Sequence, residues 1–153
     1  MFNDPLGYFI TFTIHASWLH GDMRGSYRRK GGFVEPNDDL HNVKTAISKD
    51  IVSCLTTEQR EIIQNAIEEI CQRKNWQLHE MNVRTNHIHI VITAPGIPPE
   101  KVMVGVKART TLRMRKAGFL AADQKLWTEH GSTVYLFTEH NFLRACEYVR
   151  DCQ

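Results

Sequence analysis

The sequence predicts an α+β fold in which two helices cover one face of an antiparallel sheet and a third helix follows the last strand. Three observations predict it: runs that alternate apolar and polar residues, as strands do; apolar residues at helical spacing between those runs; and the order of the two along the chain. With 153 residues, 42% hydrophobic and 24% charged, the chain has the size and composition of a globular domain. We therefore expect residues 1–153 to form one domain.

Residues 7–15 and 57–74 predict the first strand and the first helix. The run GYFITFTIH alternates large apolar residues with threonines, which favours a strand. A polar loop follows at residues 21–39, and residues 41–55 are ambiguous by periodicity. Thr57 is a candidate N-cap for a helix, with acidic residues in its first turn and an apolar stripe formed by Ile62, Ile63, Ala66, Ile67 and Ile70.

The rest of the chain predicts a hairpin, a helix, a strand and a final helix. Residues 76–83 and 87–93 are expected strands around a turn at 84–86. Residues 100–116 suit a helix that ends at Gly118, residues 133–137 suit a strand, and Thr138 is positioned to cap the last helix. The first six elements follow the β-α-β-β-α-β order of ferredoxin-like folds, which leaves one sheet face free of the crossover helices. The last helix could lie over that face.

Basic residues gather in two segments although the net charge is only +2. Residues 101–116 contain no acid, and the loop near residue 28 repeats the excess of positive charge. Such clusters suit a polyanion, so we predict nucleic-acid contacts there, with a solvated helix face as the alternative. The candidate contact residues are Arg24, Arg28, Arg29, Lys107, Arg109, Arg113 and Arg115.

Two histidines stand side by side in the third predicted strand. Because side chains alternate along a strand, His87 and His89 share one face and the isoleucines between and after them share the other. Their Cα atoms are expected roughly 6.6 Å apart, a separation from which two imidazoles can converge on one cation.

The last predicted helix carries a tyrosine outside its packing stripe. Phe142, Leu143, Ala145, Cys146 and Val149 form the expected apolar stripe, and Tyr148 falls on the other side. If this helix covers the free sheet face, the phenol comes near His87 and His89. A cation there could polarise a phosphate for attack by the tyrosine oxygen, and the alternative is an amphipathic surface tyrosine.

These features together resemble the single-tyrosine HUH transposases of bacterial insertion sequences, including the relatives associated with repetitive extragenic palindromes. The resemblance rests on NVRTNHIHIVIT, on the upstream GYFITFTIHASWLHGDMRGS, and on a tyrosine in a terminal helix after the fourth strand. It implies that His87 and His89 bind Mg²⁺ or Mn²⁺ and that Tyr148 is the nucleophile that forms a 5′-phosphotyrosine. It also implies single-stranded DNA beside a hairpin as substrate, and a homodimer.

One position departs from the family pattern. Members commonly place a further metal ligand, often an amide, one turn after the tyrosine, and Cys152 stands there in this chain. A thiol suits Mg²⁺ poorly because that ion prefers oxygen ligands. Asp151, Gln153 or Asn141 could substitute, the metal could be held more weakly, or activity could be lost.

Two hypotheses of function remain from the sequence. The first is a metal-dependent enzyme that cuts and rejoins DNA strands. The alternative is a non-catalytic module of the same fold that binds hairpin or single-stranded nucleic acid. No segment suits a membrane span or a signal peptide, so we expect a cytoplasmic protein. Tyr27, Phe33 and Trp127 are candidate residues for stacking on bases, and for Trp127 a place in the core is the equal alternative.

Overall fold

The structure is a computed structural model that describes residues 4–15 and 54–151. The predicted DNA contacts Arg24, Arg28 and Arg29 lie outside the described residues, as do Tyr27, Phe33, Cys152 and Gln153. The elements in chain order are β1 (Gly7–Thr13), α2 (Thr57–Lys74), β2 (Gln77–Val83), β3 (His87–Thr93), α3 (Pro99–Lys116), β4 (Ser132–Leu136) and α4 (Glu139–Asp151).

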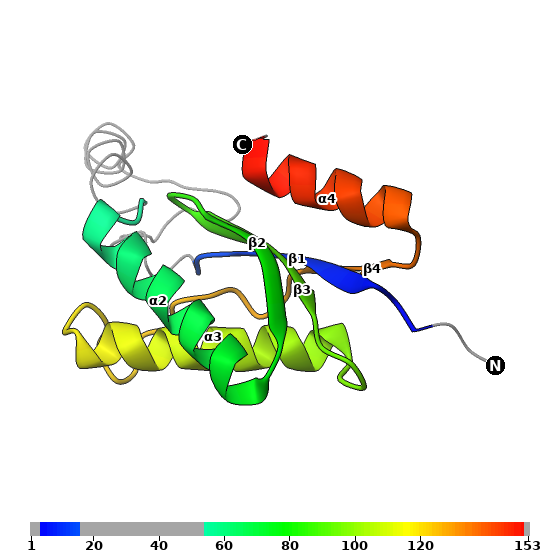
Figure 1. Ribbon diagram of the computed structural model, residues 1–153. Helices are drawn as coiled ribbons and strands as arrows, with labels where there is room; N and C mark the ends of the chain where they lie inside the picture. The colour runs from blue at the N-terminus through cyan, green and yellow to red at the C-terminus, as the bar shows by residue number, and fades with distance from the viewer. Residues whose placement is uncertain (1–3, 16–53, 152–153) are drawn as a thin grey trace, which may run out of the picture.

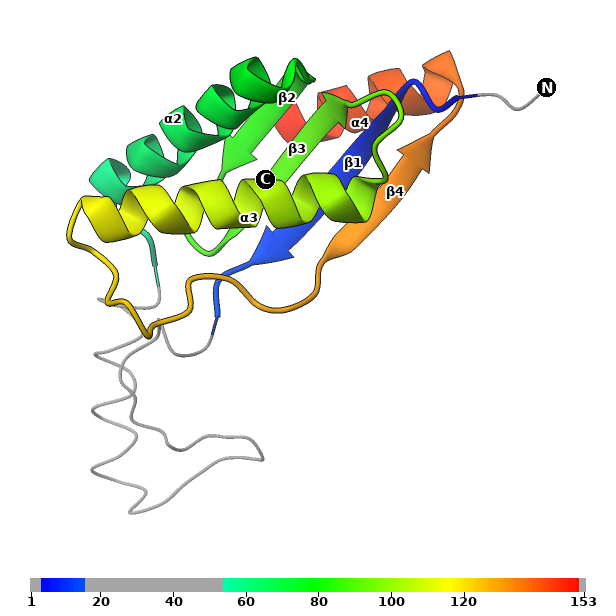
Figure 2. The same ribbon diagram turned by 90° about the horizontal axis from the view of Figure 1, so that it is seen from below.

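The sheet lies between two layers of helix. Its strands are antiparallel in the order β2-β3-β1-β4, so the first strand and the strand that carries the histidines occupy the middle. Figure 1 shows α2 and α3 on one side of the sheet and α4 on the other. Figure 2, seen from below, places α2 and α3 in front of the strands. The predicted α+β ferredoxin-like arrangement with a terminal helix is therefore confirmed.

The main core lies between the sheet and helices α2 and α3. Ile88, Ile90 and Ile92 of β3 are fully buried, as the alternation along that strand predicts. They pack with the even-numbered residues of β1 and with apolar residues of both helices, among them Ile63, Ile67, Val102 and Val106. Burial of this surface is the dominant stabilising contribution to the sheet and to both crossover helices.

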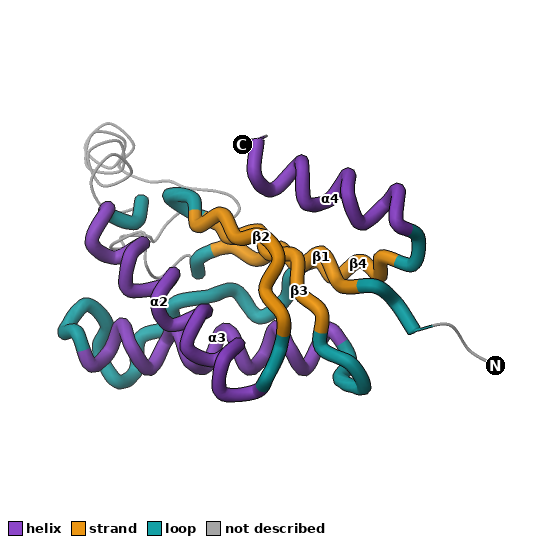
Figure 3. The backbone as a smooth tube through the Cα atoms, in the orientation of Figure 1, coloured by secondary structure: helices purple, strands orange, loops and turns teal. Residues whose placement is uncertain are grey.

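A second, smaller core lies on the opposite face of the sheet, which we call the site face. There α4 packs Ala145, Cys146 and Val149 against Val91 and Leu136, with Phe9 and Phe142 at the margin. Figure 3 shows the helix lying across the strands, with its C-terminal end above β2. The helix therefore covers part of the site face, and its N-terminal cap is Thr138, whose Oγ1 accepts a hydrogen bond from the Asn141 amide at 3.1 Å.

Several element ends differ from the sequence prediction for identifiable reasons. Thr56, not Thr57, caps α2, because its hydroxyl accepts from the Gln59 amide and the Gln59 side chain bonds back to the Thr56 amide. Strand β1 ends two residues earlier than predicted, since Ile14 leaves the ladder and bridges Trp127. The left-handed Gly118, at φ 88°, follows the C-cap of α3 as predicted.

One predicted side-chain placement is wrong, and one open alternative is decided in favour of the core. Leu143 is 57% exposed rather than part of the packing stripe of α4. Trp127, a candidate for base stacking, is 4% exposed in the main core, where its indole N–H donates to Thr110 Oγ1 at 2.8 Å. The short β4 and the loop before it carry Trp127 back under β1, a long-range placement that periodicity does not reveal.

Candidate active site

The two histidines of β3 lie together on the site face. Their ring centroids are 4.6 Å apart at an interplanar angle of 79°. Strand β1 places Thr13 opposite His87 and Thr11 opposite His89, and both threonines face the same side. His89 is 7% exposed and His87 is half-buried, so the pair sits at the edge of the small core beneath α4.

Each imidazole has a hydrogen-bond partner on Nδ1. His87 Nδ1 lies 2.7 Å from Asn86 Oδ1, and because an amide oxygen only accepts, the proton is on Nδ1. His89 Nδ1 lies 2.9 Å from the Thr11 hydroxyl. In neutral His87, Nε2 therefore has a free lone pair. In His89, Nε2 has a free lone pair as well when Nδ1–H donates to the Thr11 hydroxyl. Such partners on the second nitrogen are typical of metal-binding histidines.

The surroundings keep both imidazoles neutral at ordinary pH. Burial lowers the pKa of His89 most, and His87 and Arg84 lower it further. The pKa of His87 is lowered by burial and by Arg84. Neutral imidazole is the form that can bind a cation, so both side chains are in the protonation state that a metal ligand requires.

Stability is expected to fall as pH drops below about 6.5, the ordinary pKa of histidine. Burial lowers the native-state pKa of His79, His87 and His89, so the unfolded chain binds more protons than the native chain in this window. The free energy of unfolding is therefore at its full value above pH 6.5 and decreases toward the native pKa values. Urea titrations at pH 7.5 and 5.5 measure it, and equal midpoints would contradict the prediction.

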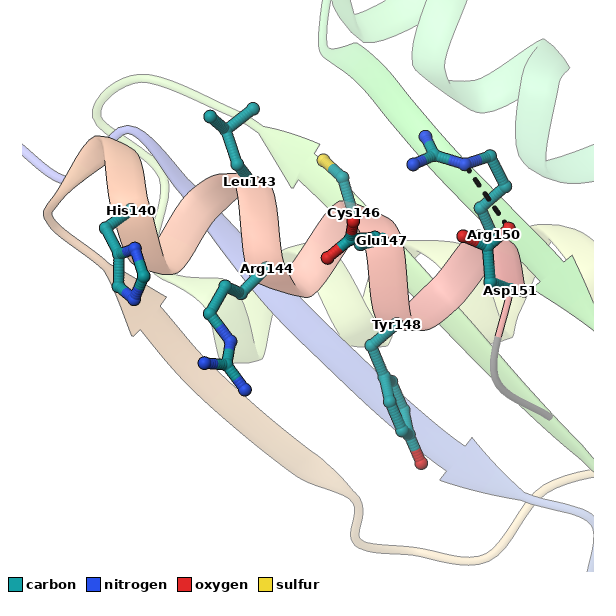
Figure 4. Close-up of a pocket in the computed structure, with 8 residues that line it drawn as sticks. All are labelled: His140, Leu143, Arg144, Cys146, Glu147, Tyr148, Arg150 and Asp151. Carbon is teal, nitrogen blue, oxygen red and sulfur yellow. Dashed lines mark ion pairs between the residues drawn. The ribbon is translucent and has the colours of Figure 1, made fainter.

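Helix α4 brings Tyr148 to the histidines. The tyrosine ring centroid is 5.5 Å from that of His89 and 5.8 Å from that of Phe9, and the side chain is 43% exposed. Figure 4 shows Tyr148 projecting from the same side of α4 as His140 and Arg144, while Leu143 projects from the other side. The structure thus brings Tyr148 next to two histidines that lie far from it in sequence.

Strand β2 holds the last turn of α4 in place. Asn82 Nδ2 donates to the Val149 carbonyl at 2.9 Å, and Arg150 pairs with Glu80 at 3.0 Å. Farther along the helix, the Phe142 ring packs on His79, with 4.7 Å between centroids. Sequence reasoning missed Asn82, Thr11 and Phe9 at this site, because only the strand register shows that they lie beside His89 and Tyr148.

The predicted third metal ligand stays a prediction. Asp151 pairs with Arg150 at 3.5 Å (Figure 4). Among residues 4–15 and 54–151, no three His, Cys, Asp or Glu side chains form a group that could hold a metal. The amide of Asn141 belongs to the first turn of α4, at the opposite end from Tyr148. Asp151 therefore stays a candidate, as do Cys152 and Gln153, which lie outside the described residues.

The basic residues of α3 lie on the sheet side away from the histidines. Lys107 Nζ donates to the carbonyls of Thr128, Glu129 and His130. Glu69 of α2 pairs with Arg113 and, at 3.7 Å, with Arg109, while Arg115 donates to two loop carbonyls. These contacts stabilise the helix layer. That the same residues also contact DNA stays a prediction.

The fold is shared with solved structures of transposases. One is a REP-associated tyrosine transposase bound to a REP hairpin, with a TM-score of 0.57 and 13% identity; the match covers 97% of this chain and 67% of that one. Another is a candidate transposase from Deinococcus radiodurans R1, with a TM-score of 0.56 and 12% identity; the match covers 98% of this chain and 92% of that one. The chain belongs to the family of IS200-like transposases, whose sequence profile matches residues 39–151.

Family membership confirms the resemblance seen in the sequence. The chain therefore belongs to a family of enzymes that act on DNA in transposition. No curated protein matches the chain. Within the described residues, no helix is long and apolar enough to span a membrane.

Proposed function

We propose that this protein is a single-tyrosine HUH transposase that cleaves and rejoins single-stranded DNA beside a hairpin. The observation that carries the proposal is the position of Tyr148, whose ring lies 5.5 Å from the ring of His89 on the site face. A nucleophile and a pair of neutral imidazoles on one surface suit phosphoryl transfer, in which attack and charge stabilisation must occur at the same phosphorus.

The proposed reaction conserves the phosphodiester energy. Tyr148 Oη attacks the scissile phosphorus and loses its proton to solvent or to a nearby base. The bond from phosphorus to the 3′ oxygen breaks, and that oxygen leaves as a 3′ hydroxyl after it takes up a proton. The product is a 5′-phosphotyrosine, which a 3′ hydroxyl can attack to restore the DNA strand and the free tyrosine.

His87 and His89 would hold a divalent cation, Mg²⁺ or Mn²⁺, through their Nε2 atoms. When bound, such a cation neutralises charge on the phosphate and orients it for in-line attack. The protein residues prepare the site for it: Asn86 and Thr11 orient the two rings, and Phe9 supports Tyr148 through an edge contact. The exposed face of Tyr148 leaves room for a DNA strand to approach.

The substrate proposal draws on the family and on the hairpin complex of the solved neighbour. That relative shares only 13% identity, so its ligand supports a hairpin DNA partner here without identifying the sequence that is bound. A homodimer belongs to the same proposal, and light scattering of the purified protein measures it directly.

Replacing Tyr148 with phenylalanine is expected to abolish the covalent DNA adduct while DNA binding is retained. The substitution removes only the attacking oxygen, and the ring contacts with Phe9 and His89 can persist. Labelled single-stranded hairpin oligonucleotides from the flanks of the gene, incubated with and without Mn²⁺, are analysed on a denaturing gel. The wild type should give a slow-migrating, Mn²⁺-dependent species.

Two other outcomes have defined meanings in this experiment. Binding by the wild type without any adduct, over several flanking hairpins, would favour the alternative of a non-catalytic binding module, which Cys152 at the expected ligand position supports. An equal adduct yield in Tyr148→Phe would show that another residue is the nucleophile.

Arg144→Ala is expected to weaken single-stranded DNA binding and to reduce the slope of log K against log salt by about 0.7, the effect of one lost phosphate contact. Arg144 is exposed and lies one turn before Tyr148 on the same side of α4 (Figure 4). Arg113→Ala is the comparison, because Arg113 pairs with Glu69 in the helix layer. Fluorescence anisotropy measures both; a larger effect at Arg113 would instead locate the DNA on α3.

A further inference from the structure

Asn82 lies directly beside His89 on the site face. The register of β2 with β3 makes Asn82 the cross-strand partner of His89, and β1 places Thr11 on the other side of the same histidine. Directly opposed residues of antiparallel strands have Cβ atoms about 4.5–5.5 Å apart, so their side chains interact on one face. A polar row of Asn82, His89 and Thr11 therefore crosses the sheet beneath α4.

The two ends of the Asn82 amide have different surroundings. Its Nδ2 donates to the Val149 carbonyl, one of the final carbonyls of α4 that has no partner within the helix. Its Oδ1 accepts no hydrogen bond from any described residue, although the side chain is half-buried. Because Nδ2 is engaged by α4, the oxygen is the end of this amide that is available to a ligand.

The histidine pair lacks an oxygen donor. Mg²⁺ and Mn²⁺ prefer oxygen ligands, and amide carbonyls are suitable ones. In the described part of the chain no carboxylate, thiol or third imidazole joins His87 and His89. Asp151, the last residue of α4, pairs with Arg150. Asn82 is the amide that the strand register sets next to one of the two imidazoles.

We propose that Asn82 supplies an oxygen ligand to the divalent cation held by His87 and His89, while its N–H group ties the last turn of α4 to the sheet. This inference rests on the two-histidine site of the proposed function. It assigns to a strand residue the role that a helix residue one turn after the tyrosine has in relatives. The same amide would then couple the position of Tyr148 to that of the cation.

The experiment measures Mn²⁺ binding to the full chain without DNA, by isothermal titration calorimetry and by the electron paramagnetic resonance of free Mn²⁺. Asn82→Ala removes both ends of the amide and is expected to weaken Mn²⁺ binding about 10–100-fold. Asn82→Asp keeps an oxygen donor and is expected to bind Mn²⁺ at least as well as the wild type. The Asn82→Asp variant should nevertheless form the DNA adduct more slowly than the wild type, because a carboxylate cannot donate a hydrogen bond to the Val149 carbonyl.

Arg150→Ala is the matched control for the position of α4. It breaks the contact with Glu80 that holds the same helical turn but removes no oxygen next to His89. We expect its Mn²⁺ affinity to equal that of the wild type. Circular dichroism melts establish that each variant is folded before its affinity is compared.

The results separate this inference from the proposed function. Wild-type affinity in Asn82→Ala, together with lost affinity in His89→Ala, would overturn the ligand role of Asn82 alone. Equal losses in Asn82→Ala and Arg150→Ala would also overturn it, because helix position would then explain both. Unchanged affinity in His89→Ala would instead contradict the metal site of the proposed function.

Discussion

His89→Ala should lower the rate of adduct formation by about 10²–10⁴-fold, since a metal ion contributes several kcal/mol to transition-state stabilisation and each 1.36 kcal/mol is a factor of ten. His89 is the more buried of the two histidines and the one that contacts Tyr148. Its removal takes away both a cation ligand and one wall of the tyrosine site. Single-turnover adduct formation on a hairpin oligonucleotide in Mn²⁺ measures the rate.

His79→Ala is the control for this effect. His79 also lies on the site face, is half-buried and supports α4 through Phe142. Its Nε2 lies 2.7 Å from the Thr93 hydroxyl, which itself donates to the Leu6 carbonyl, so the imidazole serves as a structural donor there. We expect a decrease in melting temperature with a small change in adduct rate. Equal rate losses in the two variants would mean that helix support, not cation binding, explains the effect of His89.

Val149→Asp should destabilise the contact between α4 and the sheet by about 3–5 kcal/mol, because it buries a charge without a partner. Val149 is fully buried in the small core on the site face, and its carbonyl is the acceptor for Asn82. The helix is expected to separate from the sheet while the main core under α2 and α3 remains folded. Adduct formation should be lost, because Tyr148 is the adjacent residue.

Leu143→Asp is the matched control on the same helix. Leu143 is 57% exposed, so a carboxylate there stays in water and should leave both stability and adduct rate close to wild type. Hydrogen exchange of the α4 amides, compared with those of β3, reports local release of the helix. Rapid exchange in both elements of Val149→Asp would contradict the prediction, since it would mean that the two cores unfold together.

The fold was predictable because its elements have strong local patterns. The isoleucines of β3 occupy every second position, which places His87 and His89 together on the other face, and the order of elements indicates the sheet topology. The exposed position of Leu143 was not predictable in this way. On a helix that packs by one narrow stripe, residues at the margin of the stripe have the same spacing whether they are covered or not.

The basic residues of α3 show a second limit of sequence reasoning. Their concentration in residues 101–116 indicated a nucleic-acid surface, but charge along a sequence does not show which partners the side chains reach. Glu69 lies 44 residues before Arg113, and only helix packing brings the two together. The prediction that α3 contacts DNA therefore depends on whether these ion pairs persist when DNA is present.

By itself, the sequence determined the class of fold, the shared face of the two histidines and the presence of a tyrosine outside the main helical stripe. Each of these follows from periods of two or 3.6 residues within one element. The tertiary structure decided that α4 covers the site face, that Tyr148 contacts His89 and that Asn82 lies beside His89 and donates to the last turn of α4. These contacts join residues distant in sequence, and their geometry comes from strand register and helix packing, which no local period specifies.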